Sequence, residues 1–153
     1  MNLLVAIDFS EITEAVIDHT RTLASALKAE VFLLHVIAPS TPVLDIETDP
    51  GTVHPLDAAE ILPGATVTEN RTHLQLHELA EKLRLNGISV SAHLAYNDEV
   101  DAIIKAAETF EAGMIVLGSH GHGAFYHLLI GSVSEGVIRK ATCPVIIVPS
   151  GRK

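Results

Sequence analysis

The sequence predicts an α/β fold built on a five-stranded parallel sheet, with strand order 3-2-1-4-5 and helices on both faces. Two observations lead to this prediction. Five short apolar runs alternate with segments of helical periodicity along the 153 residues, and the runs differ in a way that indicates where each strand lies in the sheet. Because no linker, repeat or shift in composition divides the chain, we expect residues 1–153 to form a single domain.

The expected strands are the apolar runs, at residues 3–7, 31–37, 88–94, 114–117 and 145–148. The first and fourth runs are continuously apolar, as in strands that are covered on both sides. In the third run, apolar residues alternate with Ser89, Ser91 and His93, which is typical of a half-exposed strand. We therefore expect this third strand at an edge of the sheet, and the order 3-2-1-4-5 satisfies both observations.

Four helices are expected between the strands. Residues 76–83 and 100–107 each carry apolar side chains at i, i+3, i+4 and i+7, the spacing of an amphipathic helix. A similar stripe begins at Ile12, for which Ser10 is the expected N-cap. The last helix is predicted to begin at residues 132–135, because Ser-Val-Ser-Glu has the form of a capping box.

Residues 38–68 depart from this regularity, since they contain five of the seven prolines. Such a stretch cannot form one long helix. A loop of this length is either a mobile surface loop, which is the simpler interpretation, or a lid over a substrate. Residues 57–62 could form one short helical turn within it.

The composition excludes several classes of function. With 10 basic and 19 acidic side chains the formal net charge is −9, so the chain lacks the clustered Lys and Arg with which proteins bind nucleic acid. The apolar runs are too short to span a membrane, and the N-terminal segment lacks the basic start of a signal peptide. The single cysteine, Cys143, cannot form an internal disulfide. We expect a cytoplasmic protein with no membrane insertion.

The strand order selects two strand ends as the place for a ligand, because open α/β sheets bind ligands where the order reverses. Asp8 follows the first strand and Gly118 ends the fourth, and six of the ten glycines lie between residues 113 and 136. The backbone N–H groups of such a loop, and of the helix that begins near Ser132, can hold an anion. An acidic chain can therefore form a phosphate cradle without cationic side chains.

The spacing of the glycines excludes the commonest phosphate-binding motifs. No G-x-x-x-x-G-K-[ST] segment is present, and the residues Gly121-His122-Gly123 are not completed by a third glycine, because Tyr126 stands at that position. What remains is the pattern G-x-x-G-x9-G-S, which begins at Gly118.

This pattern resembles the signature G-2x-G-9x-G(S/T) of the ATP-binding branch of the universal stress protein family. The resemblance extends over nearly the whole chain. It includes Asp8 after the first strand, the segment Leu-Leu-His-Val-Ile at 33–37, and the segment Ala-Thr-Cys-Pro-Val-Ile-Ile-Val at 141–148. It implies a Rossmann-like fold of the adenine nucleotide alpha hydrolase-like type.

The resemblance also implies a role for each matching residue. Asp8 would accept a hydrogen bond from a ribose hydroxyl, Val36 would line an adenine pocket, and Gly118 would pass near the ribose. The remaining residues would hold the phosphates through N–H and hydroxyl groups: Gly121, Gly131, Ser132, Val133 and Ser134. The ligand would be ATP, ADP or AMP, with Mg²⁺ or Mn²⁺ arriving on the phosphates.

Several of these residues have a simpler structural alternative. Asp8 and Ser132 could be helix caps, and Val36 could belong to the core. The turn Asp8-Phe9-Ser10 also departs from the family, in which a glycine commonly precedes the serine, so the shape of the ribose side stays open.

Histidines surround the glycine loop, and His122 stands where the family often has a basic residue. Together with His120 and His127 it could strengthen phosphate binding below about pH 6.5, where imidazoles become charged. These three, or the pair His73 and His77 at i, i+4 spacing, could instead bind Zn²⁺ or Ni²⁺. Because the sequence fixes no cysteine or carboxylate nearby, we favour solvated histidines and predict no intrinsic metal site.

The last strand, Val145 to Val148, is wholly apolar although the predicted order places it at a sheet edge. Exposed edges of this kind promote association. We expect the same strand of a second copy to cover it in a homodimer, which the resemblance also implies.

The glycine loop contains no Lys or Arg, and no paired carboxylates are evident. We therefore favour a stress-response protein that binds a nucleotide and acts as a dimeric switch on an unknown regulatory partner, over a dedicated enzyme. Three alternatives stay open: slow ATP hydrolysis, an interaction module of the same fold that has lost nucleotide binding, and a nucleotidyl or phosphoryl transferase.

Overall fold

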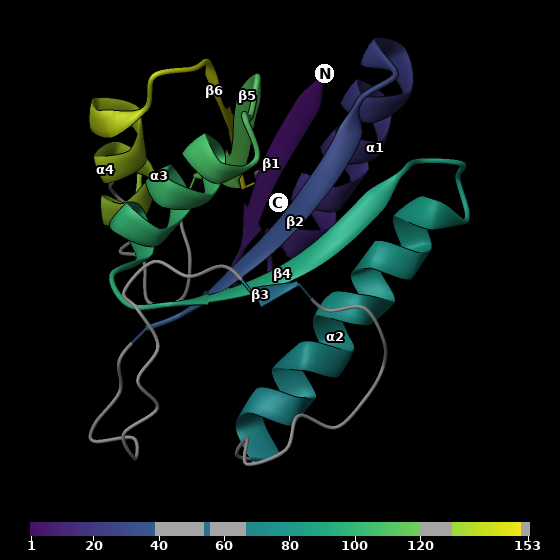
Figure 1. Cartoon of the computed structure of the whole chain (residues 1–153), viewed down its shortest axis with the longest axis horizontal. Helices are drawn as coiled ribbons and strands as arrows, with labels where there is room; N and C mark the ends of the chain where they lie inside the picture. Colours follow the sequence, from purple (N-terminus) through teal and green to yellow (C-terminus); the bar gives the residue numbers. More distant parts are fainter. Residues whose placement is uncertain (39–53, 56–66, 120–129, 151–153) are drawn as a thin grey trace.

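The structure is a computed structural model that describes residues 1–38, 54–55, 67–119 and 130–150 (Figure 1). In the described part, five parallel strands form the sheet: β1 (Asn2–Ile7), β2 (Glu30–Ile37), β4 (Val90–Tyr96), β5 (Met114–Gly118) and β6 (Val145–Val148). They run in the order β4-β2-β1-β5-β6. The predicted fold class and the order 3-2-1-4-5 are thus confirmed.

A two-residue strand, β3 (His54–Pro55), extends the sheet beyond β4. It pairs antiparallel with β4, with Pro55 opposite His93. The sequence predicted no strand in this proline-rich stretch. The helical turn expected at 57–62 lies outside the described residues.

Two pairs of helices cover the two faces of the sheet (Figure 1). Helices α1 (Thr13–Leu27) and α2 (Val67–Arg84) pack on the face to which Val5 and Leu33 point. Helices α3 (Glu99–Thr109) and α4 (Ser132–Lys140) pack on the other face, against Leu4 and Ile115. Neighbouring residues of a strand thus point into different cores, which explains why the central strands are continuously apolar.

The third expected strand is not half-exposed. In β4 only Ser91 and Tyr96 are partly exposed, and His93 is buried. The ring of His93 lies 4.5 Å from that of Phe110 and 5.9 Å from that of Phe32, and its Nε2 atom lies 2.9 Å from Ser91 Oγ. Aromatic faces and a hydroxyl provide this imidazole with a buried environment that the alternating pattern did not reveal.

Both predicted serine caps are wrong. The N-cap of α1 is Ile12, because the hydroxyl of Ser10 donates to Asp8 Oδ1 at 2.6 Å. The N-cap of α4 is Gly131, which has no side chain to form the predicted capping box, and the Glu135 carboxylate accepts a hydrogen bond from Arg139 at 2.6 Å. Short polar side chains near a helix start can serve other backbone and side-chain partners.

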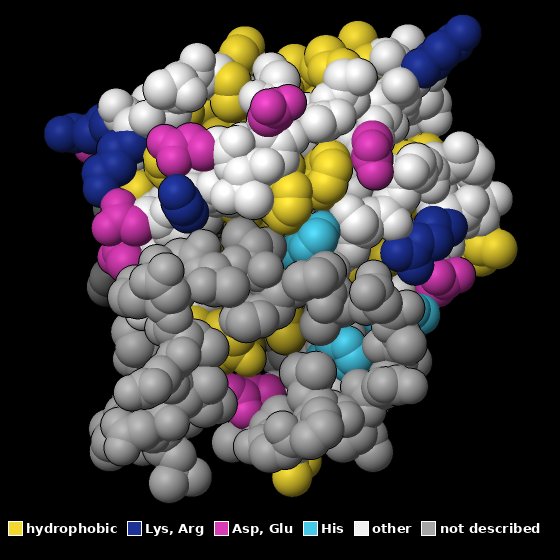
Figure 2. Space-filling view, viewed as in Figure 1, with side chains coloured by type: hydrophobic (Ala, Val, Ile, Leu, Met, Phe, Trp, Pro, Cys, Tyr) yellow, Lys and Arg dark blue, Asp and Glu magenta, His cyan; other side chains and the backbone are white. Residues whose placement is uncertain are grey.

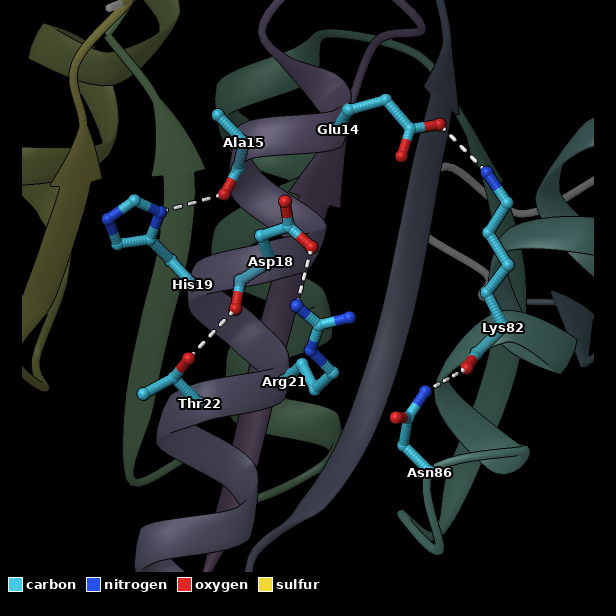
Figure 3. A network of polar contacts seen from close by, with 8 residues as sticks. All are labelled: Glu14, Ala15, Asp18, His19, Arg21, Thr22, Lys82 and Asn86. Carbon is cyan, nitrogen blue, oxygen red and sulfur yellow. Dashed lines mark hydrogen bonds and ion pairs between the residues drawn. The ribbon is translucent and has the colours of Figure 1, made fainter.

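Helices α1 and α2 are joined on their outer surface by an ion pair between Lys82 and Glu14, whose N···O distance is 2.8 Å (Figure 3). Both side chains are mostly exposed. Pairs of this kind contribute about 1 kcal/mol or less, so the apolar core and not this contact holds α2 on the sheet.

None of the helices in the described ranges is long and apolar enough to cross a membrane.

Candidate functional site

The candidate site lies at the carboxyl edge of the sheet, where β1 and β5 are neighbours. Their register pairs Val5 with Val116, and continuing it by two residues brings Ile7 level with Gly118. From this edge the chain leaves β1 toward α1 on one face, and it reaches α4 on the other face after β5. The strand order therefore reverses between β1 and β5, as predicted, and such a switch point is where open α/β sheets bind ligands.

Two short hydrogen bonds fasten the start of α4 to the end of β5. The N–H of Gly131 donates to the Ser119 carbonyl at 2.6 Å, and the hydroxyl of Ser134 donates to the Gly118 carbonyl at 2.7 Å. Ser119 also donates through its own N–H to the Val148 carbonyl at 2.8 Å. Sequence reasoning did not single out Ser119, although a buried serine directly after the fourth strand connects β5, β6 and α4.

The first turn of α4 follows an extended residue, Gly131, with φ −73° and ψ 161°. The amides of Ser132, Val133 and Ser134 are thus the first helical amides, which have no carbonyl partner within the helix. Their alignment gives this helix end a partial positive charge of about half a unit. Since the Ser134 hydroxyl already binds Gly118, its backbone N–H is the group suited to an anion.

Asp8 is held in a tight turn at the end of β1. Its Oδ1 atom accepts hydrogen bonds from the N–H of Ser10 at 3.0 Å and from the Ser10 hydroxyl at 2.6 Å. The intervening Phe9 has a φ of 59°, in the left-handed region that glycine adopts most readily. The turn therefore has a backbone conformation that favours glycine, although phenylalanine occupies the position.

Phe9 is stabilised in this conformation by packing. Its ring lies 4.8 Å from that of His35 and contacts the core beneath α1. The Nδ1 atom of His35 in turn lies 2.8 Å from the Ile7 carbonyl. These contacts fix the end of β1 against β2, and Asp8 is thereby positioned by the rigid sheet.

Val36, near the end of β2, is buried in the core on the α3 and α4 face. Its side chain is thus a core side chain, and its backbone stands near the end of β2, where the adenine pocket is expected. The neighbouring Ile37 carbonyl accepts a hydrogen bond from the N–H of Asn97 at 3.3 Å. This contact joins β2 to the turn that leads from β4 into α3.

A second carboxylate at this edge, Glu99, was missed by sequence reasoning. It is the first residue of α3 and is half-buried, after the N-cap Asp98, whose carboxylate accepts from the N–H of Asp101 at 3.1 Å. Burial, together with the nearby carboxylates of Asp8 and Asp98, raises the pKa of Glu99. In the sequence, the feature that could have pointed to Glu99 is the acidic pair Asp98-Glu99, which follows the third expected strand.

Within the glycine loop, which runs from Gly118 to Gly131, residues 120–129 lie outside the described residues. Gly121, His120, His122 and His127 therefore remain predictions. In the ranges the structure describes, no group of three or more His, Cys, Asp or Glu side chains is arranged to hold a metal ion.

The interpretation of His73 as a solvated histidine is wrong. It lies on the inner face of α2 and is only 2% exposed. Burial and the nearby His77 lower the pKa of His73, which favours the uncharged form of this core imidazole.

The chain matches the model of the Universal stress protein family over residues 1–149. Universal stress protein MJ0577 of Methanocaldococcus jannaschii is 27% identical over 161 residues, which cover 95% of this chain and 93% of that protein. Universal stress protein YxiE of Bacillus subtilis is 28% identical over 95% of this chain and 97% of its own length.

Solved structures share the fold. Hypothetical protein MJ0577 superposes with a TM-score of 0.72 at 25% identity, covering 99% of this chain and 97% of that one. A universal stress protein in complex with cAMP has a TM-score of 0.69 at 18% identity over 99% and 98% of the two chains. The universal stress protein from Archaeoglobus fulgidus in complex with dAMP has a TM-score of 0.64 at 24% identity over 97% of each.

Proposed function

Because the chain belongs to the universal stress protein family, we propose that it is a cytoplasmic stress-response protein that binds an adenine nucleotide at the carboxyl ends of β1 and β5. One observation carries the proposal. The first turn of α4 is fastened to the end of β5 by the bonds from Gly131 to Ser119 and from Ser134 to Gly118. A helix start held rigidly at a switch point is suited to a phosphate group.

In this proposal the phosphates bind the amides of Ser132, Val133 and Ser134, together with the expected amide of Gly121. Asp8 accepts a hydrogen bond from a ribose hydroxyl, for which its position one strand away from Gly118 is suitable. The adenine lies beside the backbone at Val36. Two proteins of the same fold form complexes with cAMP and dAMP, which agrees with an adenine nucleotide as the ligand.

Mg²⁺ or Mn²⁺ would accompany the nucleotide, since its phosphates supply oxygen ligands that such cations prefer. Asp8, the proposed site carboxylate that directly follows β1, already accepts two hydrogen bonds from Ser10 at its Oδ1 atom. We therefore assign it no role as a metal ligand. The protein thus contributes backbone dipoles and orientation, and a bound metal ion would supply positive charge to the phosphates.

The functional readout that we propose is a change in a dimer. β6 pairs with β5 along one side, and Val145, Ile146 and Ile147 stay partly exposed. Pairing of β6 with the same strand of a second copy would cover this edge. Ser119, next to Gly118, donates its N–H to the carbonyl of Val148 in β6. A nucleotide bound at the end of β5 could therefore shift β6 through this hydrogen bond, and so alter the dimer edge and the surface offered to a regulatory partner.

The test is to identify nucleotide released from the purified full chain by mass spectrometry and to titrate nucleotide-free protein with ATP and Mg²⁺. A Gly131→Asp variant sharpens it. The extended backbone of Gly131 suits aspartate, which is a favoured N-cap, so the variant should fold at least as stably as the natural chain. Its carboxylate would repel phosphate, and we expect the Kd to rise about tenfold or more.

Gly131→Asn is the matched control. It places a capping side chain of nearly the same shape at the same helix start but adds no charge, so it should weaken binding less than Gly131→Asp does. Retention of no nucleotide, together with no binding on titration, would leave the interaction module as the function. ATP turnover above about 1 s⁻¹, within the usual range of enzymes, would favour an ATPase or a transferase.

A further inference from the structure

We propose that Glu99 makes the nucleotide site selective for ligands of low negative charge, such as a nucleoside monophosphate or a cyclic monophosphate, over a nucleoside triphosphate. This inference rests on the proposed function, because it concerns the phosphate side of the same site. Glu99 stands apart from the residues that match the family signature.

The start of α3 packs against the middle of α4. A Cβ atom added to Gly136 would lie 2.6 Å from the side-chain atom Val100 Cγ2, so the missing side chain of Gly136 makes room for Val100. Val100 directly follows Glu99. The hydrogen bond from the Asn97 N–H to the Ile37 carbonyl fixes this end of α3 at the carboxyl edge of the sheet. Glu99 therefore lies at the carboxyl edge of the sheet, on the face that also carries α4, whose start is proposed to hold the phosphates.

The carboxylates at this edge influence one another. Asp8 directly follows β1 and Glu99 begins α3, so both stand at the carboxyl edge of the sheet, and burial, Asp8 and Asp98 raise the pKa of Glu99. Asp8 belongs to the ribose side of the site and Glu99 to the start of α3. A phosphate chain bound between the ends of β1 and α4 therefore approaches two negative groups.

Little positive charge opposes them. The sequence has no Lys or Arg between Lys105 and Arg139, a stretch that contains the whole glycine loop. Arg139 and Lys140 lie in the last turn of α4, where they pair with Glu135 and Asp101 at 2.6 Å each, and Figure 2 shows basic side chains beside acidic ones on one face of the molecule. The helix end itself supplies about half a unit of positive charge, which suits one phosphate better than three.

The experiment measures the Kd of AMP, ADP and ATP for the full chain by isothermal titration calorimetry. It is performed at pH 8 without divalent cations, where histidines are neutral and no metal masks the phosphate charge. We expect AMP to bind more tightly than ATP. Glu99→Gln should lower the ratio of the Kd of ATP to that of AMP by about threefold or more, and Glu99→Asp should keep the natural ratio.

Glu108→Gln is the matched control, because it removes the same charge from the opposite end of α3, where the side chain is exposed. The ratio should not change. A second measurement needs no variant: raising the salt concentration from about 50 mM to about 500 mM should lower the ratio in the natural chain, since salt screens charge repulsion.

The outcomes are distinguishable. Unchanged ratios in Glu99→Gln, or a ratio that salt does not alter in the natural chain, would overturn the role of Glu99 while nucleotide binding itself stands. If no nucleotide binds the natural chain, the proposed function fails first.

Discussion

His73 is a residue whose behaviour follows directly from its position. It is nearly fully buried on the inner face of α2, and burial and His77 lower its pKa. In the unfolded chain the pKa is about 6.5, so below that pH the unfolded state takes up a proton more readily than the folded state. The contribution of His73 to stability is therefore complete above about pH 6.5 and is lost as the pH falls below it.

We accordingly expect the urea midpoint to decrease as the pH is lowered from about 7 to about 5. In His73→Gln the urea midpoint should decrease less over the same pH range, because glutamine has no group that takes up a proton. His19→Gln is the control, since His19 is exposed on α1 with its Nδ1 atom 2.8 Å from the Ala15 carbonyl (Figure 3), and it should keep the natural pH dependence. Identical slopes for His73→Gln and the natural chain would contradict the assignment.

At the scale of elements, the turn between β4 and α3 stores backbone strain. Asn97 has a φ of 104°, which only glycine adopts without cost. Residues in such regions cost about 1–3 kcal/mol each and cluster at functional sites. The strained residue lies two positions before Glu99, at the start of α3. The strain thus occurs in the turn that positions Glu99.

Asn97→Gly should raise the free energy of unfolding by about 1 kcal/mol, because glycine relieves the positive φ. Urea unfolding measures the change. The control is Asn86→Gly. The natural Asn86 donates through its side chain to the Lys82 carbonyl at 2.7 Å, and its φ is not positive. This variant should be destabilised, and destabilisation of Asn97→Gly as well would contradict the strain argument.

The secondary structure elements were predictable to different degrees. The strands follow from the apolar runs, because buried strands leave a direct pattern in the sequence. Their order was also predicted correctly, although the half-exposed third strand that supported it was not found. The burial of His93 was not predictable, since its partners Phe32 and Phe110 come from β2 and the end of α3. The caps failed for a similar reason: the hydroxyl of Ser10 found a partner in Asp8.

The candidate site shows the same division. Asp8 and the start of α4 were predictable because the strand order selects their position. Glu99 was not, because its proximity to Asp8 arises only when α3 packs across the sheet beside α4. Contacts between elements that are distant in the chain leave no local pattern.

At the scale of the whole molecule, the proposed dimer depends on the side of β6 that faces away from β5. Along a parallel strand, the backbone N–H and C=O groups of successive residues point alternately to the two neighbouring strands. The carbonyls of Pro144 and Val148 accept hydrogen bonds from Ile115 and Ser119, so both carbonyls face β5. The alternation directs the N–H of Ile147 away from β5. Proline is tolerated at such edge positions but cannot donate a hydrogen bond to another strand.

Ile147→Pro should therefore convert the dimer into a monomer while the sheet stays intact. Light scattering after size-exclusion chromatography measures the mass, and circular dichroism checks the fold. Ile138→Ala, on α4, trims an exposed apolar side chain without changing the backbone of β6 and serves as the control. A natural chain that is already monomeric, or a variant that stays dimeric, would contradict the β6 interface.

The most direct measurement for the nucleotide site is an amide chemical-shift titration of the ¹⁵N-labelled chain with AMP. We expect saturable shifts of the amides of Ser132, Val133 and Ser134, because a phosphate at the start of α4 accepts hydrogen bonds from them. In Gly131→Asp the same shifts should require about tenfold more AMP or more, because the added carboxylate repels phosphate. Saturable shifts that leave these three amides unchanged, or no shifts at all, would contradict a phosphate site at the start of α4.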